Sequence, residues 1–367
     1  MKAQKIMRGI GKVLLILLAV AVLCTLATFV VHRIKTRKEI TLLKEQGYYH
    51  PVSVGEYCLN AARFGNESGR HTIVGLAGNG IGDFSVAARQ MTACLETDNQ
   101  VVFIDRAGYG FSDDTEQEMT LAYIVEDYRK ALKSAEIDAP YILMAHSIGG
   151  AYANYWASKY PEEIEAVVLV DGSQLSGDAF DDWEESEVEI GDRFLAMLAK
   201  LGVSRYVLRD YFYHYPDNYS QDEQALGDAL TLMTLDSIAP ISESARLAEN
   251  AQQAFEEIVT NDIPKLYICA SWGMESEEDI LENNKWINRQ IEINNMDINP
   301  RPLEYDEETL KEILDRFQKA RETTIYPYAE KMGNCKVVCL GGDHMIYEQN
   351  PEECGRIIKE FIDGLEG

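Results

Sequence analysis

The sequence has no CxxC pair and no cluster of cysteine with histidine, although it contains seven cysteines. Zinc sites and thiol redox centres are built from such spacings, so we expect neither a metal site nor a redox centre. Cys269, Cys335 and Cys339 fall in apolar runs typical of strands, and we interpret them as small buried side chains. Internal repeats and low-complexity segments are also missing, and a chain that is 46% hydrophobic is typical of a globular protein.

Basic residues are also scarce, because 34 Lys and Arg stand against 61 Asp and Glu, for a formal net charge of −27. Residues 1–38 hold eight of the basic residues and no acidic one, so −27 less this +8 leaves −35 on the rest of the chain. A domain this acidic repels phosphate backbones and anionic headgroups. Nucleic acid is therefore excluded as an expected partner.

Charged residues are also absent from residues 13–31, which form an apolar run of nineteen residues. This run is long enough to cross a bilayer as a helix, so we predict an N-terminal transmembrane helix and a membrane anchor over residues 1–38. A cleaved signal peptide and a buried core helix are the alternatives. The apolar region of a signal peptide is usually shorter, and no clean A-x-A cleavage site is present.

The anchor predicts a single-pass membrane protein whose remaining domain is extracytoplasmic. The four basic residues on each side of the apolar run nearly balance, so the positive-inside rule does not settle the orientation. Residues 39–48 are charged, and we predict a helical stalk there.

Short apolar strands alternate with helices in residues 49–173 and 263–367, which predicts one α/β core with a parallel sheet covered on both faces. Residues 174–262 interrupt this alternation with an acidic, helical stretch, which we interpret as a lid inserted over a site. A second insertion, residues 275–302, is predicted to be irregular. Strands are expected at residues 72–77, 100–105, 141–146, 166–171, 265–270 and 336–340, and helices at 84–96, 121–134, 148–160 and 351–365.

The most informative motif is Ala145-His146-Ser147-Ile148-Gly149-Gly150, between a predicted strand and a predicted helix. A nucleophile on a strained strand-to-helix turn needs small residues two positions before and two positions after it. Ala145 and Gly149 meet this demand, so Ser147 is the candidate nucleophile. The turn also aims the N-terminus of the helix at a developing oxyanion.

Three further motifs arrive in a fixed order: Leu76-Ala77-Gly78-Asn79-Gly80, then DRAGYGFS at residues 105–112, then Gly341-Gly342-Asp343-His344 after the last strand. Together with the serine motif, in which Ala145 replaces the first Gly of G-x-S-x-G, they resemble the α/β-hydrolase family over residues 50–173 and 263–365. The resemblance implies a mostly parallel, eight-stranded α/β-hydrolase sheet flanked by helices. It covers neither the anchor nor the lid.

The resemblance also implies the roles of the site residues. His344 is the expected general base, since a histidine can take the serine proton near neutral pH and return it to the leaving group. Ile148 and Asn79 are the expected oxyanion donors through their backbone N–H groups, although Ala77-Gly78 replaces the family's usual His-Gly. Gly78-x-Gly80-x-Gly82 does not have dinucleotide-binding spacing, so we expect no cofactor.

The acid that orients the histidine is left open between two residues. Most relatives place an aspartate just after the seventh strand, where this chain has Gly273, with Glu275 two residues later. Another branch of the family supplies the acid at the end of the sixth strand, and Asp171 stands there. We favour Asp171 and keep Glu275 as the alternative.

A serine nucleophile excludes relatives that attack with aspartate, such as haloalkane dehalogenases and epoxide hydrolases. We predict a membrane-anchored serine hydrolase that cleaves a carboxylic ester of an apolar or amphiphilic acyl substrate. A peptidase of the proline-iminopeptidase kind, a thioesterase, an acyltransferase or a C–C bond hydrolase would use the same core. An inactive binding module is the alternative from another class, and the oligomeric state stays open.

Overall fold

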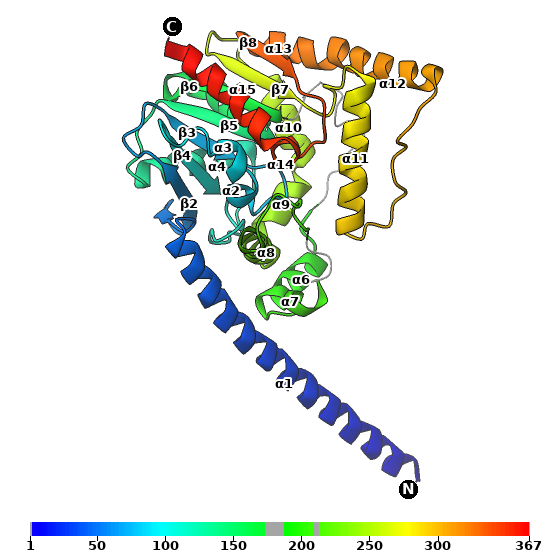
Figure 1. Ribbon diagram of the computed structural model, residues 1–367. Coiled ribbons are helices and arrows are strands. Elements are labelled where there is room, and N and C mark those ends of the chain that lie inside the picture. The colour runs from blue at the N-terminus through cyan, green and yellow to red at the C-terminus, as the bar shows by residue number, and fades with distance from the viewer. Residues whose placement is uncertain (1, 173–186, 209–212, 367) are drawn as a thin grey trace.

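The computed structural model describes residues 2–172, 187–208 and 213–366 (Figure 1). One eight-stranded sheet, in the order β1-β2-β4-β3-β5-β6-β7-β8, forms its centre. β1 pairs antiparallel with β2 and β2 with β4, while the remaining pairs are parallel, which confirms the predicted sheet. The strands are β1 Pro51–Ser53, β2 Cys58–Gly65, β3 Thr72–Leu76, β4 Gln100–Asp105, β5 Tyr141–Ser147, β6 Ile164–Gly172, β7 Lys265–Cys269 and β8 Cys335–Cys339.

Helices cover both faces of this sheet. The α-helices are α1 Lys2–Glu45, α2 Phe84–Ala87, α3 Arg89–Thr92, α4 Leu121–Ser134, α5 Gly149–Lys159, α6 Ile190–Lys200, α7 Ser204–Val207, α8 Gln221–Leu235, α9 Ala239–Ala245, α10 Leu247–Glu256, α11 Glu277–Ile293, α12 Glu307–Ala320, α13 Tyr326–Met332, α14 Ile346–Gln349 and α15 Pro351–Asp363. One apolar cluster joins the sheet to α4, α5, α10 and α13, and a second joins it to α2, α8, α14 and α15. The central strands are apolar on both faces because both faces are covered.

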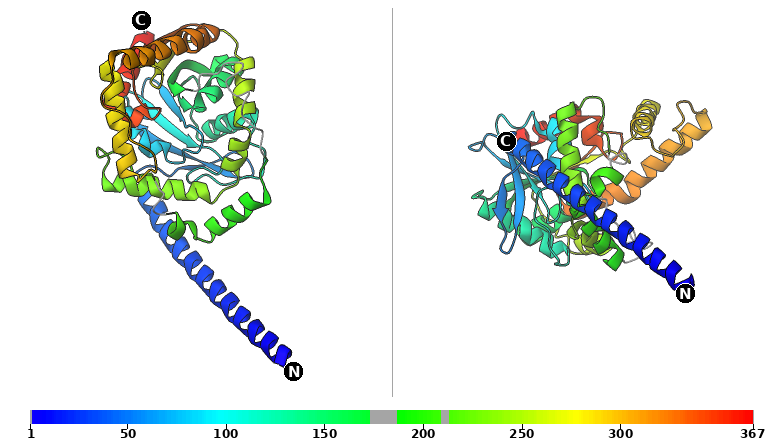
Figure 2. Two further views of the ribbon diagram at one scale, coloured as in Figure 1. Left: turned by 90° about the vertical axis from the view of Figure 1, so that its right-hand side faces the viewer. Right: turned by 90° about the horizontal axis from the view of Figure 1, so that it is seen from below.

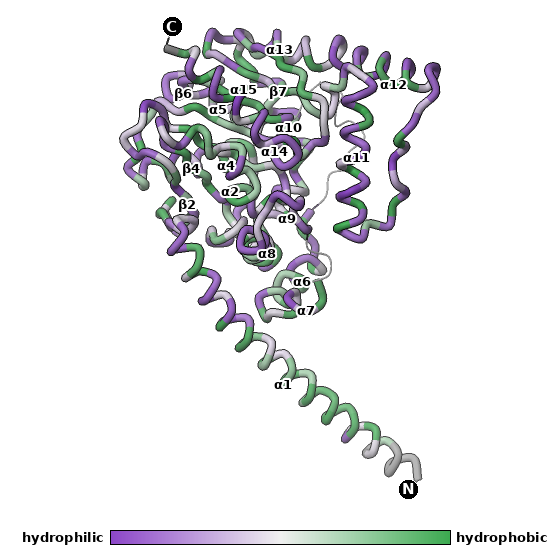
Figure 3. Tube along the Cα trace, viewed as in Figure 1, coloured by the Kyte–Doolittle hydropathy of each residue, from purple (hydrophilic) through white to green (hydrophobic). Residues whose placement is uncertain are grey.

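The N-terminal helix α1 is continuous for 44 residues and includes most of the predicted stalk. Its apolar half extends away from the domain (Figures 1 and 3), while Leu43 near its other end is buried in the core. Its length and composition suit a membrane span, and they suit a signal sequence equally well. The predicted anchor therefore stays a prediction.

The insertion at residues 174–262 is helical where the structure describes it, from α6 to α10. Residues 174–186 and 209–212 lie outside the described residues. Figure 2 shows α8 crossing the end of α1, and α6 and α7 lying beside that helix. α10 packs on α4 and α5, so the insertion is attached to the core at several points.

Two local predictions were wrong. Residues 275–302 are not irregular throughout, because α11 occupies most of them. Ser276 caps this helix by accepting from the N–H of Asp279, whose carboxylate accepts from the N–H of Ser276. The predicted helix at 84–96 is divided into the short helices α2 and α3.

Candidate active site

Ser147 lies on a strained turn at the end of β5, directly before α5. Its φ is +51°, in the left-handed region that residues with a side chain rarely adopt. A Cβ on Gly149 would lie 2.5 Å from the carbonyl oxygen of Leu76, so this position admits only glycine. The side chain of Ser147 is partly exposed, as a nucleophile requires.

The loop after β3 passes directly over this turn. A Cβ on Gly78 would come within 3.0 Å of Ser147 Cβ, so glycine lets the two segments approach. The backbone N–H groups of Asn79 and Ile148 donate no hydrogen bond to any residue in the described part of the chain. Both are therefore available to an oxyanion near Ser147.

Asp171 is aimed by an irregularity in β6. His146 pairs with Val170 and Ser147 with Gly172, which leaves Asp171 as the extra residue of a β-bulge. Its φ is +44°, again in the left-handed region. The bulge therefore changes the direction of the Asp171 carboxylate at the end of β6, which is the strand next to the one that carries Ser147.

The carboxylate of Asp171 is 4% exposed and fully hydrogen-bonded. Its Oδ1 accepts from the N–H groups of Ala270, at 2.8 Å, and Ser271, at 3.1 Å. Its Oδ2 accepts from Ser271 Oγ at 2.6 Å and from His344 Nδ1 at 2.7 Å. Burial raises the pKa of Asp171, but the bonds from His344, Ser271 and Ala270 outweigh burial and hold the pKa below its usual range.

His344 combines this buried partner with a ring that is 46% exposed. Partial burial lowers the pKa of His344, but the hydrogen bond and charge of Asp171 outweigh it and leave the pKa above its usual value. Because Nδ1–H donates to Asp171, Nε2 is the nitrogen that can accept a proton.

His146 contacts His344 through a hydrogen bond and through its ring. Its Nε2–H donates to the carbonyl oxygen of His344 at 3.0 Å, and the two rings lie 4.6 Å apart. Burial, followed by the charge of His344, lowers the pKa of His146 to about 3, so this ring is neutral at ordinary pH. Its neighbour in sequence, Ser147, consequently lies close to the loop that carries His344.

The structure thus brings Asp171 and His344 together at the end of β6, the strand next to the one that carries Ser147, and leaves Glu275 apart. The side chain of Glu275 is 60% exposed and lies 3.6 Å from Arg321. Within the described residues, Ser147 Oγ and His344 share no hydrogen bond. Such contacts are often long without substrate and shorten when it binds.

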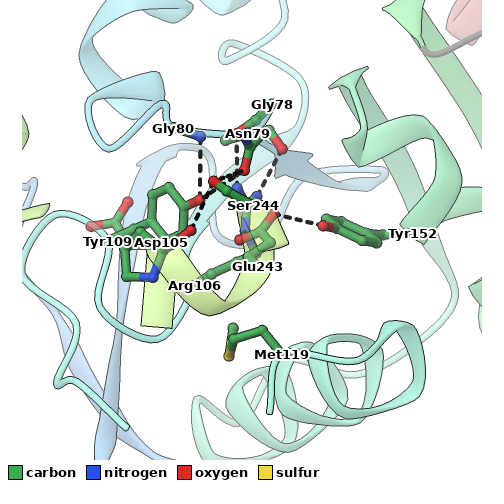
Figure 4. Close-up of polar contacts among 12 residues, drawn as sticks. Gly78, Asn79, Gly80, Asp105, Arg106, Tyr109, Met119, Tyr152, Glu243 and Ser244 are labelled. Carbon is green, nitrogen blue, oxygen red and sulfur yellow. Dashed lines mark hydrogen bonds and ion pairs between the residues drawn. The ribbon is translucent and has the colours of Figure 1, made fainter. Parts of the chain in front are cut away.

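A buried ion pair between Arg106 and Glu243 holds the loop at residues 77–80, called the oxyanion loop below after its expected role, and no sequence pattern pointed to Glu243 (Figure 4). Arg106 donates to the carbonyl oxygens of Ala77, at 2.7 Å, and Gly78, at 2.8 Å. Its Nε donates to Glu243 Oε2 at 2.8 Å, and Tyr152 donates to Glu243 Oε1 at 2.6 Å. These bonds fix the carbonyl groups of Ala77 and Gly78 and so restrain the loop.

Glu243 belongs to α9, within the insertion, and is completely buried. Arg106 stands in the DRAGYGFS motif and could have been singled out there, but no spacing links Glu243 to it across 137 residues. Ser271, which donates to Asp171, was also missed. Its only signal is its place just after β7.

The insertion contains several aromatic residues close in sequence, and the structure describes three of them, Tyr206, Tyr213 and Tyr215. Tyr211 and Phe212 lie outside the described residues. Tyr206 is exposed, whereas Tyr213 donates to Glu348 at 2.8 Å and Tyr215 donates to Asp83. The last two therefore attach the insertion to the core.

Residues 75–211 match the family model described as the alpha/beta hydrolase fold. The uncharacterized protein YbdG of Bacillus subtilis (strain 168) is 36% identical over 169 residues. That alignment covers 45% of this chain and 51% of YbdG, so the match spans about half the length of this relative.

Solved structures resemble the chain over a larger part of its length. The haloalkane dehalogenases DbeA, from Bradyrhizobium elkani, and DatA, from Agrobacterium tumefaciens, superpose with TM-scores of 0.52 and 0.54, each at 16% identity. Each alignment covers 86% of this chain, with 98% of DbeA and 96% of DatA. At this identity the likeness shows the fold alone.

Proposed function

We propose that the chain, which has the α/β-hydrolase fold, is a serine hydrolase that cleaves a carboxylic ester or a related acyl bond through an acyl-enzyme on Ser147. One observation carries the proposal. The hydrogen-bonded pair of Asp171 and His344 lies at the end of the strand next to a serine on a strained turn, and the N–H groups of Asn79 and Ile148 donate to no described residue.

In this proposal His344 Nε2 takes the proton of Ser147 Oγ as the oxygen attacks the acyl carbon. The N–H groups of Ile148 and Asn79 stabilise the oxyanion. The imidazolium then gives its proton to the departing alcohol, which leaves the acyl group on Ser147. Water, deprotonated by His344, attacks this acyl-enzyme and releases the acid.

Asp171 holds the tautomer and orientation of His344 throughout and stabilises the imidazolium when it forms. Its own charge persists because four hydrogen bonds compensate its burial. Glu275 has no part in this mechanism.

We extend the proposal to location, with residues 13–31 as a membrane anchor and the hydrolase domain on the extracytoplasmic side. The exposed apolar half of α1 supports the anchor. An anchored enzyme meets amphiphilic acyl substrates at the bilayer. Protease protection in sealed vesicles would test the side.

A fluorophosphonate probe tests the chemistry on the full chain, because it reacts with activated serines. We expect labelling of the wild-type protein and none of Ser147→Ala. Equal labelling of both proteins, or no labelling of a folded wild-type protein, would contradict the proposal and favour a binding module. Acyl esters of increasing chain length would then define the substrate.

A further inference from the structure

Helix α6 has an unusual distribution of side chains, because large apolar residues lie on its outer face. Ile190, Phe194 and Met197 are exposed and follow the i, i+4, i+7 spacing of one helix face. Ala196 and Ala199 form the buried face. In a helix that meets water, the large apolar residues would be the buried ones.

Helix α7 continues this surface. Its residues Tyr206 and Val207 are also exposed, with 56% and 62% of their surface accessible. We call the exposed side chains of Ile190, Phe194, Met197, Tyr206 and Val207 the outer apolar face.

The segment that carries the outer apolar face is fixed to α1. Thr28 Oγ1 donates to the carbonyl oxygen of Leu201 at 3.0 Å, and a Cβ on Gly202 would lie 2.5 Å from His32 Cβ. Arg205 donates to both carboxylate oxygens of Glu39, each at 2.6 Å, and to His32 Nδ1 at 2.9 Å. Figures 1 and 2 show α6 and α7 beside α1 in every view.

These contacts set the height of the outer apolar face along α1. The apolar run ends at Val31, and at a rise of about 1.5 Å per residue Thr28 lies roughly 4.5 Å inside it. A groove of about 350 Å³ between α1 and Leu201 reaches further, to Ala21. Its lining residues are Ala21, Val22, Thr25, Leu26, Phe29 and Leu201.

We propose that α6 and α7 are a second membrane-contact element, whose outer apolar face lies among the acyl chains at the bilayer surface. The inference rests on the proposed anchor at residues 13–31. Interfacial helices bury an apolar face roughly 5–10 Å into the boundary between headgroups and acyl chains, which agrees with the height set by Thr28. Acyl chains also fill the groove beside Leu201.

The polar contacts of α6 agree with this placement, because they point to the protein. Lys200 pairs with Asp114 at 3.2 Å, and Arg193 pairs with Glu116. These pairs leave the outer apolar face to the lipid. Since the domain carries a large negative charge, zwitterionic lipid is the expected partner.

Depth-dependent quenching tests the proposal on the full chain in phosphatidylcholine vesicles. Phe194→Trp places a reporter on the outer apolar face. Tyr326→Trp is the matched control, because Tyr326 is also an exposed aromatic residue but lies on α13, at the far end of the domain (Figure 1). With brominated acyl chains, the emission added by Phe194→Trp should fall by about half, and that added by Tyr326→Trp should not change.

The outcomes separate this inference from the proposed function. If the chain floats with the vesicles and both reporters resist quenching, the anchor stands and the second contact is wrong. If the chain does not float, both the anchor and the second contact are wrong. Quenching needs no hydrolase activity, so its result does not depend on the role of Ser147.

A kinetic arm adds a functional readout. Met197→Asp places a charge on the outer apolar face and should lower hydrolysis of a bilayer-dissolved ester several-fold, while a water-soluble ester is hydrolysed as before. Equal rates for variant and wild type on both esters, or an equal loss on both, would overturn the proposal.

Discussion

Asp171 and Glu243 are both buried carboxylates, but they meet different partners. Asp171 pairs with a histidine whose ring is 46% exposed and can exchange a proton. Glu243 pairs with Arg106, which is itself buried and stays protonated at any ordinary pH. One of these carboxylates therefore meets a group that can titrate, whereas the other meets a charge that does not change.

Among substitutions of these two carboxylates, removing the charge of Asp171 should have the largest effect, and it should appear in kcat. We expect Asp171→Asn to lower kcat by about 10³–10⁴-fold while the protein stays folded, because His344 loses the partner that fixes its tautomer. The matched control is Glu275→Gln, which should leave kcat nearly unchanged. Steady-state kinetics with an activated ester measures both, and a large loss in Glu275→Gln alone would reverse the assignment.

Removing Glu243 should instead appear in stability. Glu243→Ala leaves the Arg106 charge buried without its partner, which should lower the free energy of unfolding by about 3–5 kcal/mol. Urea unfolding followed by circular dichroism measures the change. A loss below about 1 kcal/mol, as for an exposed pair, would show that water reaches Arg106.

A milder change at Glu243 tests whether its hold on the oxyanion loop affects catalysis. Glu243→Gln keeps the volume and one acceptor, so the fold should persist. The looser hold on the oxyanion loop should lower kcat about tenfold with little change in KM, less than the roughly 10²–10³ cost of losing an oxyanion donor. A kcat equal to that of the wild type would confine Glu243 to stability.

The smallest expected effect is on the pH profile. The general base must be neutral, so kcat/KM should fall as the pH drops below the raised pKa of His344. Asp171→Asn removes the charge and the charged hydrogen-bond partner that do most to raise this pKa, while burial still lowers it and only the smaller effect of Asp343 still raises it, so the acid limb should move to lower pH. NMR titration of His344 in a Ser147→Ala background measures the same shift, and an unmoved titration would contradict the stated cause.

The sequence predicted the core better than its surroundings, for physical reasons. Continuous apolar strands and the small residues around Ser147 are local requirements, and both are visible in the order of residues. The predicted end of the sixth strand pointed to Asp171 as a candidate acid. The bulge that directs its carboxylate, however, depends on the pairing of β6 with β5. The choice between Asp171 and Glu275 therefore needed the fold.

Glu243 was beyond prediction because its partner is brought to it only by the folded insertion. Nothing in the helical pattern of residues 239–245 distinguishes a buried carboxylate from the many exposed ones in this acidic chain. The helix α11 was a different kind of failure, because Ser276 and Asp279 carry a local capping signal that was overlooked.

The unbroken helix α1 has one more consequence. Between the end of its apolar run and Glu45 it contains no interruption, and Leu43 is rooted in the core. A helix of this kind is a stiff strut, and residues 32–45 set its attachment to the sheet core roughly 20 Å from the end of the run, while the insertion contacts α1 nearer that end at Thr28 and His32. Adding a single residue to the strut would turn the domain by about 100° about its axis, so its length fixes which way the serine faces as well as how far it reaches.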